Sequence, residues 1–561
     1  MSSACPYLFS VGLDNPTMTG FRQLRRGFTN APMKRASRAD IRDRRQMKKI
    51  YKIALLALLP ITFLVSLLAW AYASPVGASP DDDYHLASIW CGGGTDNLCM
   101  ESDSKGHMLV PASAIESSDC YRFNPGLSGG CVGEQIEEFV DSDRGNFKGD
   151  YPPFFYATLS IFSGDNLFSS VVLMRAFNGI LFIALMTCAA VLLPVSRKKT
   201  LLWAVFASIV PLGMFIIPSV NPSSWAITSS AVLWISLVGF FETKKRWRMV
   251  ALALLASLAA FIGAGSRGDA ALYTILGAGV ACILMFEWRK EFFIRATLPI
   301  AISIFAGSMF LTSGHSSAAD PSVMKAENVF NHTFQVLVHL PELWAGALGV
   351  DGLGWLDTKL PGTTWVAVMV VFGSLSFWGL RQLDMRKVLA VTGIALSLIA
   401  IPAYIMVKDG VLIGQGVQAR YIYPLMIIFL GVCLFRVRQG SFWPNSFQLS
   451  IAALAISVAN AVALHVNMRR YLTGITNGSA NLNNSIEWWW PTSIMPFAPM
   501  TVWMIGSIAF ALGAGALVWL SWCMKQADRT GVAGSGRSVW SDGDRSAIEV
   551  NQRADGRRGA E

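Results

Sequence analysis

Runs of apolar residues long enough to cross a lipid bilayer recur along the chain, and they constrain its fold more than any other feature. A membrane-spanning helix needs about 20 mostly apolar residues. Hydrophobic residues make up 53% of the 561 residues and charged residues only 15%, which is too little charge to cover a soluble protein of this size. We therefore predict an all-α integral membrane protein with about twelve transmembrane helices. The expected spans lie near residues 50–73, 168–194, 200–218, 223–241, 249–265, 270–287, 295–313, 364–380, 388–407, 421–436, 448–466 and 499–522.

The distribution of basic residues predicts how these spans are oriented. The net charge is +10, and Lys and Arg gather before the first span and in alternate short loops. With twelve spans these segments fall on one side, which the positive-inside rule assigns to the cytoplasm. We expect a multi-pass protein of the cell membrane with both termini cytoplasmic, and no nucleic-acid partner. The basic loop residues are Arg197, Lys198, Lys199, Lys244, Lys245, Arg246, Arg248, Arg289, Lys290, Arg381, Arg386, Lys387, Arg436 and Arg438.

The segment between the first two predicted spans contains four cysteines and many acidic residues. Cys91, Cys99, Cys120 and Cys131 face the outer, oxidising side in this topology. Four such cysteines favour two disulfides, for which three pairings exist. A zinc site is the competing interpretation, but the spacing lacks a Cys-x-x-Cys pair. We expect a small outer loop that is stapled by disulfides.

The apolar spans divide the chain into three parts. Residues 1–49 are predicted to be a disordered, basic cytoplasmic leader, and the polar residues 524–561 a disordered cytoplasmic tail. Residues 50–523 form the predicted polytopic membrane domain. Its main outer loops are expected at residues 74–167, 314–363 and 467–498.

An aspartate triplet directly after the first span is the strongest candidate for chemistry. Asp81, Asp82 and Asp83 follow Pro80, and His85 shares a helix face with Asp81. One interpretation is a helix start, because Pro and carboxylates suit the first turn. The other is functional: Asp81 or Asp82 is a general base, or both hold a divalent cation, Mg or Mn, that neutralises a lipid phosphate. His85 would orient the carboxylate of Asp81.

Landmarks in a fixed order extend from this triplet to residue 424 and carry a resemblance. Pro80-Asp81-Asp82-Asp83-Tyr84-His85-Leu86 resembles the Pro-Asp-Glu-x-x-His segment of the domain of unknown function 2142 family. Asp82 replaces the family's Glu, which shortens the reach of the carboxylate, and the cysteine-bearing insertion 91–131 is longer than the family's loop. The other landmarks are Tyr151-Pro152-Pro153-Phe154-Phe155-Tyr156, Arg175, Asn221-Pro222-Ser223, Gly354-Trp355-Leu356-Asp357 with Pro361, and Gln418-Ala419-Arg420-Tyr421-Ile422-Tyr423-Pro424.

The resemblance implies a plan similar to that of GT-C glycosyltransferases, which are membrane enzymes. They carry an acidic base on the first outer loop and use polyprenyl-phosphate sugars. In this chain the implied base is Asp81 or Asp82. The implied partners are the lipid bilayer, a polyprenyl-phosphate-linked sugar, and an envelope glycan or protein as acceptor.

Arg420 is the expected ligand of the donor phosphate, because a guanidinium suits a phosphate leaving group. Gln418 and Tyr421 would assist it. The alternative for Arg420 is that it snorkels to the outer headgroups. Arg267 and Asp269 are expected to form a charged pair near the same surface, either in the site or as a surface ion pair.

Two further candidates come from charge inside or beside the membrane. Arg175 falls within the second span, where a charge requires an answering group, and a pairing with one of Asp81–Asp83 is our hypothesis. Asp357 is expected to line a cleft with His332 and His339, which do not form a metal motif.

The predicted function is transfer of a sugar from a polyprenyl-phosphate donor on the outer face. Two other functions are compatible with the same residues. A transporter or flippase of lipid-linked saccharides would bind the donor without breaking a bond, and Pro211, Pro218 and Pro402 hint at discontinuous helices. A scaffold for envelope assembly would depend on the loop 91–131 more than on any single carboxylate.

Overall fold

The computed structural model describes residues 57–95, 98–131, 138–314, 326–414, 417–436, 443–476, 478–484 and 486–535. All of these belong to one unit of the chain, Leu55–Glu561. The predicted leader, residues 1–49, lies outside the described residues, and so do residues 536–561 of the predicted tail.

Nine of the described helices are long and apolar enough to cross a membrane. Their lipid-side character is visible in exposed apolar side chains, such as Leu311 at 77% and Phe377 at 76% exposure, which water would disfavour. The nine helices are α5 (Leu167–Leu192), α8 (Ser223–Glu242), α9 (Arg246–Ala264), α10 (Gly268–Met285), α11 (Lys290–Thr312), α13 (Gly362–Gly379), α14 (Met385–Asp409), α16 (Ser446–Thr473) and α17 (Pro499–Ser535).

The other three predicted spans are occupied by shorter helices. Ala57–Tyr72 is described at the first position and α15 (Ala419–Cys433) at the tenth. At the third, the helix is broken into α6 (Val195–Ser208) and α7 (Leu212–Ile216). Tyr423 donates a hydrogen bond to the carbonyl of Ser208, at 2.5 Å, and so satisfies one backbone group that the break leaves free. Twelve full-length spans are therefore not what the described residues contain.

Capping residues explain where several helices begin. The side chain of Asn166 accepts a hydrogen bond from the backbone of Ser169, which starts α5. Asn445 and Gln448 form a capping box at the start of α16, so two otherwise unpaired backbone donors are satisfied together. The side chain of Asp384 accepts a hydrogen bond from the backbone of Lys387 at 2.9 Å and so caps α14.

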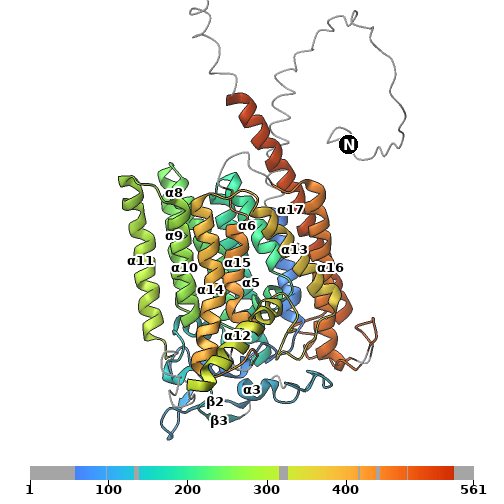
Figure 1. The fold of residues 1–561 in the computed structure, drawn as a ribbon. Helices are drawn as coiled ribbons and strands as arrows, with labels where there is room; N and C mark the ends of the chain where they lie inside the picture. The colour runs from blue at the N-terminus through green and yellow to red at the C-terminus, as the bar shows by residue number, and fades with distance from the viewer. Residues whose placement is uncertain are drawn as a thin grey trace, which may run out of the picture. The chain divides into compact units, whose positions relative to one another are not determined.

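Helix α11 lies at the periphery of the helical part (Figure 1), whereas α8 is the most buried of the nine candidate spans. The apolar window of α8 is 94% buried and that of α11 is 22% buried. α8 packs against α5, α6, α9, α10 and α15.

The first outer segment is built from short elements at one end of the long helices (Figure 1). The strands form one antiparallel sheet in the order β1-β2-β3, with Met100 opposite Leu109 and Leu109 opposite Asp141. The elements are α2 (Asp82–Trp90), β1 (Met100–Glu101), β2 (Met108–Pro111), α3 (Ala112–Ile115), η1 (Glu116–Ser118), β3 (Phe139–Ser142), η2 (Asn146–Lys148), α4 (Phe154–Leu159) and η3 (Ser160–Phe162).

Disulfides staple this segment, as the sequence predicts. Cys91 is bonded to Cys99, and Cys120 to Cys131. Each bond therefore joins cysteines that are neighbours in the sequence. The prediction of a purely α-helical fold missed the small sheet, because its strands have two to four residues and show no readable alternation.

Two expected segments contain more helix than predicted. The second outer loop, predicted at residues 314–363, contains the 22-residue helix α12 (Ala326–Ala347), which packs on α14 and α15 (Figure 1). Helix α17 continues to Ser535, past the predicted end of the membrane domain at residue 523. Helix α17 therefore extends beyond the apolar residues from which the span was predicted.

Candidate functional site

The backbone that leads from the first helix to the aspartate triplet is buried and bound along its whole length. Residues 71–80 have few backbone bonds of their own, and buried carbonyls need partners. Ser79 accepts from the backbone of Asp82; the other nine carbonyls accept from side chains. Arg175 binds those of Ala71, Ser74 and Pro75, Trp490 that of Tyr72, Asn467 that of Ala73, Tyr121 that of Val76, Trp355 that of Gly77, Tyr471 that of Ala78, and Asn221 and Arg420 that of Pro80.

Asp81 lies at the end of this clamped segment, in a conformation unusual for a residue other than Gly. Its φ is +61°, in the left-handed region, and it is the N-cap of α2. The structure holds it there because Asn221 and Arg420 both donate to the carbonyl of Pro80, at 2.8 and 3.1 Å. A residue kept in this region indicates a backbone that its surroundings over-determine, as is common at functional sites.

The carboxylate of Asp81 is partly accessible and paired with arginine. Its side chain is 34% exposed, whereas that of its partner Arg420 is 3% exposed. Arg144 approaches its other oxygen to 3.9 Å. Burial would raise the pKa of Asp81, but the positive charge of Arg420, aided by Arg144, holds it below its usual value. Asp81 is therefore an ionised carboxylate that a ligand can reach.

Asp82 is in a different environment, although it is the next residue. It is fully buried, and one oxygen accepts a hydrogen bond from the backbone of Ser79 at 3.1 Å. Its other oxygen has no hydrogen-bond partner among the described residues. Burial raises the pKa of Asp82 to about 7, against the lowering charge of Arg175. A substrate cannot reach this carboxyl in the described arrangement.

Asp83 is also buried, but it is neutralised by two arginines. Arg144 donates to both of its oxygens, at 2.5 and 2.9 Å, and Arg122 donates at 2.9 Å. These bonds fasten the loops that follow the first helix onto α2. Asp83 therefore acts as an anchor for the outer segment.

His85 does not orient Asp81 through a hydrogen bond, contrary to expectation. Its Nδ1 is 3.0 Å from the hydroxyl of Tyr156. Burial lowers the pKa of the His85 imidazole to about 3, so the ring is neutral. The helical spacing does place its ring near Asp81, but its partner comes from α4.

A second charged pair lies beside Arg420, as predicted. Arg267 donates to both oxygens of Asp269, at 2.8 and 2.9 Å. Its guanidinium lies over the ring of Tyr421, 4.6 Å from the centroid, and the hydroxyl of Tyr421 accepts from Arg420 at 3.2 Å. Because both Arg267 and Asp269 are largely buried, this is not a surface ion pair. Tyr421 connects the two arginines.

Gln418 lines a small cavity on the other side of Arg420. The residue is the N-cap of α15, and its side-chain oxygen is buried without a hydrogen-bond partner among the described residues. Leu212, Phe215 and Asp351 also line this cavity. Arg420 therefore lies between an accessible carboxylate and a cavity with apolar walls and two further polar groups.

Arg175 and Asp357 are placed differently from their predictions. Arg175 gives its hydrogen bonds to three backbone carbonyls and none of the described contacts is an ion pair with the triplet, although its charge acts on Asp82. Asp357 binds Arg470 at 2.7 Å. His332 and His339 bond to Met406 and Glu342, so they do not share a cleft with Asp357.

A divalent cation does not fit this arrangement. The ionised carboxylates are already answered by guanidiniums: Asp81 by Arg420, Asp83 by Arg122 and Arg144. Among the described residues, no three His, Cys, Asp or Glu side chains form a group that could hold a metal. Guanidiniums this close would repel a cation and attract an anion. We therefore derive no step through a metal at Asp81 and Asp82.

Sequence reasoning missed several residues that build the site. Arg144 and Arg122 lie in polar loops, where nothing local distinguishes them from other exposed arginines. Asn221 was noticed only as a landmark, yet its side chain holds Pro80 and thereby Asp81. An Asn-Pro-Ser string between two apolar runs is the one signal that points to it.

Comparison with known proteins adds a family. A family model described as predicted membrane protein, DUF2142, matches residues 64–429. This range contains every charged residue of the site from Asp81 to Arg420. No curated protein and no solved structure matches the chain.

Proposed function

The chain belongs to the DUF2142 family of predicted membrane proteins, and we propose that it is a membrane glycosyltransferase with a GT-C-like site. A sugar moves from a polyprenyl-phosphate donor to an envelope glycan or protein. The observation that carries the proposal is the pairing of the accessible carboxylate of Asp81 with the buried guanidinium of Arg420. A general base and an anion ligand then lie side by side, which is what transfer from a phosphate-linked sugar requires.

Arg420 is the proposed ligand of the donor phosphate. Arginine binds phosphate through two parallel hydrogen bonds, and the Nε of Arg420 is buried without a hydrogen-bond partner among the described residues. Leu212 and Phe215 form an apolar wall of the adjoining cavity, which at about 20 Å³ must widen to admit an isoprene unit of the lipid. Arg267, held by Asp269 and Tyr421, adds positive potential beside this position.

Asp81 is the proposed general base. When the phosphate engages Arg420, Asp81 loses the counter-charge that lowers its pKa and becomes a stronger base. The hydroxyl oxygen of the acceptor attacks the anomeric carbon, and the bond from that carbon to the phosphate oxygen breaks. The hydroxyl proton passes to Asp81, and polyprenyl phosphate leaves as an anion on Arg420. Because a stabilised anion leaves, the step needs no nucleotide hydrolysis.

The location of the reaction follows from the topology that we propose. The basic loops lie at the cytoplasmic side of the cell membrane. Helix α8 begins just after Asn221, which contacts Pro80, and ends at Glu242 beside those loops. The site then lies at the outer end of the helices, on the side where envelope acceptors are found.

A transporter or flippase of lipid-linked saccharides is the second candidate. The observation that favours it is the break between α6 and α7, next to Pro211. Discontinuous helices are frequent in transporters. However, the break is filled by Tyr423, and α7 lines the cavity beside Arg420, so the same break also shapes a donor site.

The test measures free polyprenyl phosphate released by the full-length protein in lipid nanodiscs. A panel of polyprenyl-phosphate sugars is supplied with envelope acceptor extract. We expect Asp81→Asn to lower release at least 100-fold, because a general base typically contributes that much. Asp103→Asn, an exposed aspartate of the same outer segment, is the matched control and should retain release. Arg420→Ala should lose both donor binding and release.

The result separates the candidates if the variants fold. Unfolding temperature and both disulfides are checked first. Donor binding or translocation by wild type, with no release under any acceptor condition, would falsify the transferase and favour the flippase. If release of polyprenyl phosphate is lost in Asp82→Asn but retained in Asp81→Asn, the general base is Asp82 and not Asp81.

A further inference from the structure

A basic cavity lies at the end of the helices opposite to Asp81. It has a volume of about 480 Å³. Five basic side chains line it against one carboxylate, that of Glu242. The basic residues are Arg197, Lys244, Lys245, Arg248 and Arg436.

The single carboxylate in this cavity is already neutralised. Arg197 is 9% exposed and donates to both oxygens of Glu242, at 2.9 and 3.1 Å from its Nε. Arg197 also donates to the carbonyl of Arg436 at 2.6 Å and lies over the ring of Phe435. The charges of Lys244, Lys245 and Arg248 are therefore not answered by Glu242.

The backbone adds to the positive potential at this position. Pro194 and Ser196 line the cavity at the start of α6, and Lys245 is the N-cap of α9. Neither helix has an acidic residue in its first turn, although the helix dipole favours one there. Basic side chains at two helix starts are unfavourable unless an anion joins them.

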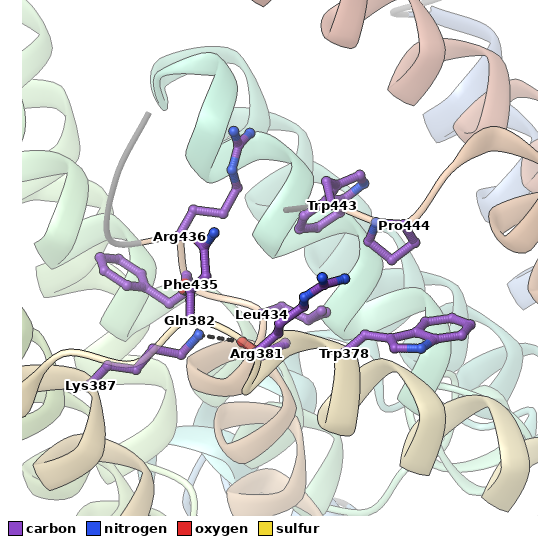
Figure 2. A pocket seen from close by; sticks show the side chains of 10 residues that line it. Trp378, Arg381, Gln382, Lys387, Leu434, Phe435, Arg436, Trp443 and Pro444 are labelled. Carbon is purple, nitrogen blue, oxygen red and sulfur yellow. Dashed lines mark hydrogen bonds between the residues drawn. The ribbon is translucent and has the colours of Figure 1, made fainter. Parts of the chain in front are cut away.

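A second pocket at the same end of the helices also contains basic residues, and there the buried lysine has a structural role (Figure 2). There Lys387 donates to the carbonyl of Gly379 at 2.7 Å and to that of Phe435 at 2.9 Å. The ammonium thus satisfies the ends of α13 and α15, as a cation at a helix C-terminus should. In the cavity at α6 and α9 the cations lie at helix N-termini, so this explanation does not apply.

Several exposed apolar residues are close in sequence to residues that line the basic cavity. Val191, Val195, Trp247 and Val250 are 49%, 38%, 60% and 54% exposed, and each is next or close in sequence to a cavity residue. An exposed Trp beside basic residues is typical of the membrane interface. The cavity thus lies where an apolar, lipid-facing surface meets the polar end of the helices.

We propose that this cavity binds the phosphate of an anionic phospholipid of the cytoplasmic leaflet. The phosphodiester lies between the starts of α6 and α9, within reach of Lys244, Lys245 and Arg248. The acyl chains run down the apolar surface beside Val195 and Trp247. This site is independent of the glycosyltransferase proposal, because it lies at the other end of α8.

The experiment titrates the full-length protein, in neutral detergent, with short-chain phosphatidylglycerol and reads binding by native mass spectrometry. Phosphatidylcholine of equal chain length and inorganic phosphate are the comparison ligands. The test variant is Lys245→Gln/Arg248→Gln, and Lys244→Gln/Lys245→Gln is a second one. The matched control is Arg289→Gln/Lys290→Gln, which removes the same charge from exposed residues of another basic loop.

We expect phosphatidylglycerol to bind better than phosphatidylcholine, and the test variant to weaken that binding about 30-fold, because each basic residue near an anionic headgroup contributes roughly a factor of five. The control should change it less than threefold. If the test and control variants lose phosphatidylglycerol affinity equally, the lipid is bound by diffuse surface charge. That result would contradict the proposed site. Inorganic phosphate binding as tightly as the lipid would overturn the lipid as its occupant.

Discussion

Three consecutive aspartates in this protein have three different states, and their surroundings decide which. Asp81 is partly exposed and ionised by Arg420, Asp83 is buried but neutralised by two arginines, and Asp82 is buried without such a partner. Desolvation raises the pKa of a carboxyl and a nearby cation lowers it. Chemistry that needs an accessible, ionised group can therefore use only Asp81.

The raised pKa of Asp82 predicts a pH dependence of stability. Its pKa is about 7 in the folded protein, against 3.8 as the usual value. Folding therefore retains a proton that the unfolded chain releases between these pH values, so the contribution of Asp82 is complete below pH 4 and is lost as pH rises to about 7. At about 1.4 kcal/mol per pH unit, the full difference is roughly 4 kcal/mol.

Asp82→Asn tests this at single-residue scale. An amide does not titrate, so the variant should not lose this stability as pH rises. The free energy of unfolding of the variant, relative to that of wild type, should therefore increase between pH 4 and pH 8. Chemical denaturation in detergent at several pH values measures it, with the exposed Asp103→Asn as the control. Parallel pH curves for wild type and Asp82→Asn would contradict the assignment.

At the scale of elements, residues 71–80 form the end of the first helix and the loop that follows it, and neighbouring elements hold this segment in place. Its carbonyls are bound from α5, α15, α16 and the outer loops, so helices distant in sequence converge on it. Residues of α16 lie beyond the family match at residue 429, yet Asn467 and Tyr471 bind this segment. The C-terminal helices thus complete the support of Asp81.

Arg175→Leu is expected to be strongly destabilising. It leaves three buried carbonyls without their donor, and each unsatisfied group costs about 1–3 kcal/mol, so the loss is roughly 5 kcal/mol. The matched control is Arg295→Leu, since Arg295 also binds three carbonyls, those of Phe240, Phe241 and Thr243, but is only partly buried. Unfolding temperature and yield of folded protein measure both. Equal effects would show that burial of the segment is not what makes Arg175 important.

At the scale of the whole molecule, apolar surface and charge together predict one orientation. The peripheral helices expose apolar side chains, as Ile304 of α11 does at 69%, and only lipid can cover these without cost. Basic loops gather at one end of the helices and the acidic, disulfide-bonded segment at the other. By the positive-inside rule, both features predict that the first outer segment lies outside the cell.

Labelling of introduced cysteines tests this orientation in intact cells. Ser104→Cys lies in the exposed outer segment and Lys244→Cys in a basic loop. A membrane-impermeant thiol reagent should modify Ser104→Cys at least tenfold more than Lys244→Cys, because the bilayer excludes charged reagents. After permeabilisation both should react. The opposite pattern would invert the topology and move the proposed site to the cytoplasm.

The sequence determined the class of this fold because lipid imposes a strong local rule. A span must satisfy its own backbone and present about 20 apolar residues, so nine long helices could be located from runs of residues alone. The carboxylates after the first span, Arg420 and the pair of Arg267 with Asp269 were found because charge at a membrane boundary is conspicuous. The four cysteines were assigned to disulfides for a similarly local reason, their shared compartment.

Only the tertiary structure decided which of these residues act together. The partners of Asp81 and Pro80 are Arg420 and Asn221, which are separated from them by well over 100 positions in the sequence. Their meeting depends on how α8 and α15 pack, and no local pattern encodes that. Contacts between other elements pair His85 with Tyr156 and Asp357 with Arg470, against expectation. Burial separated Asp81 from Asp82, because desolvation is set by neighbours from other elements and not by residue type.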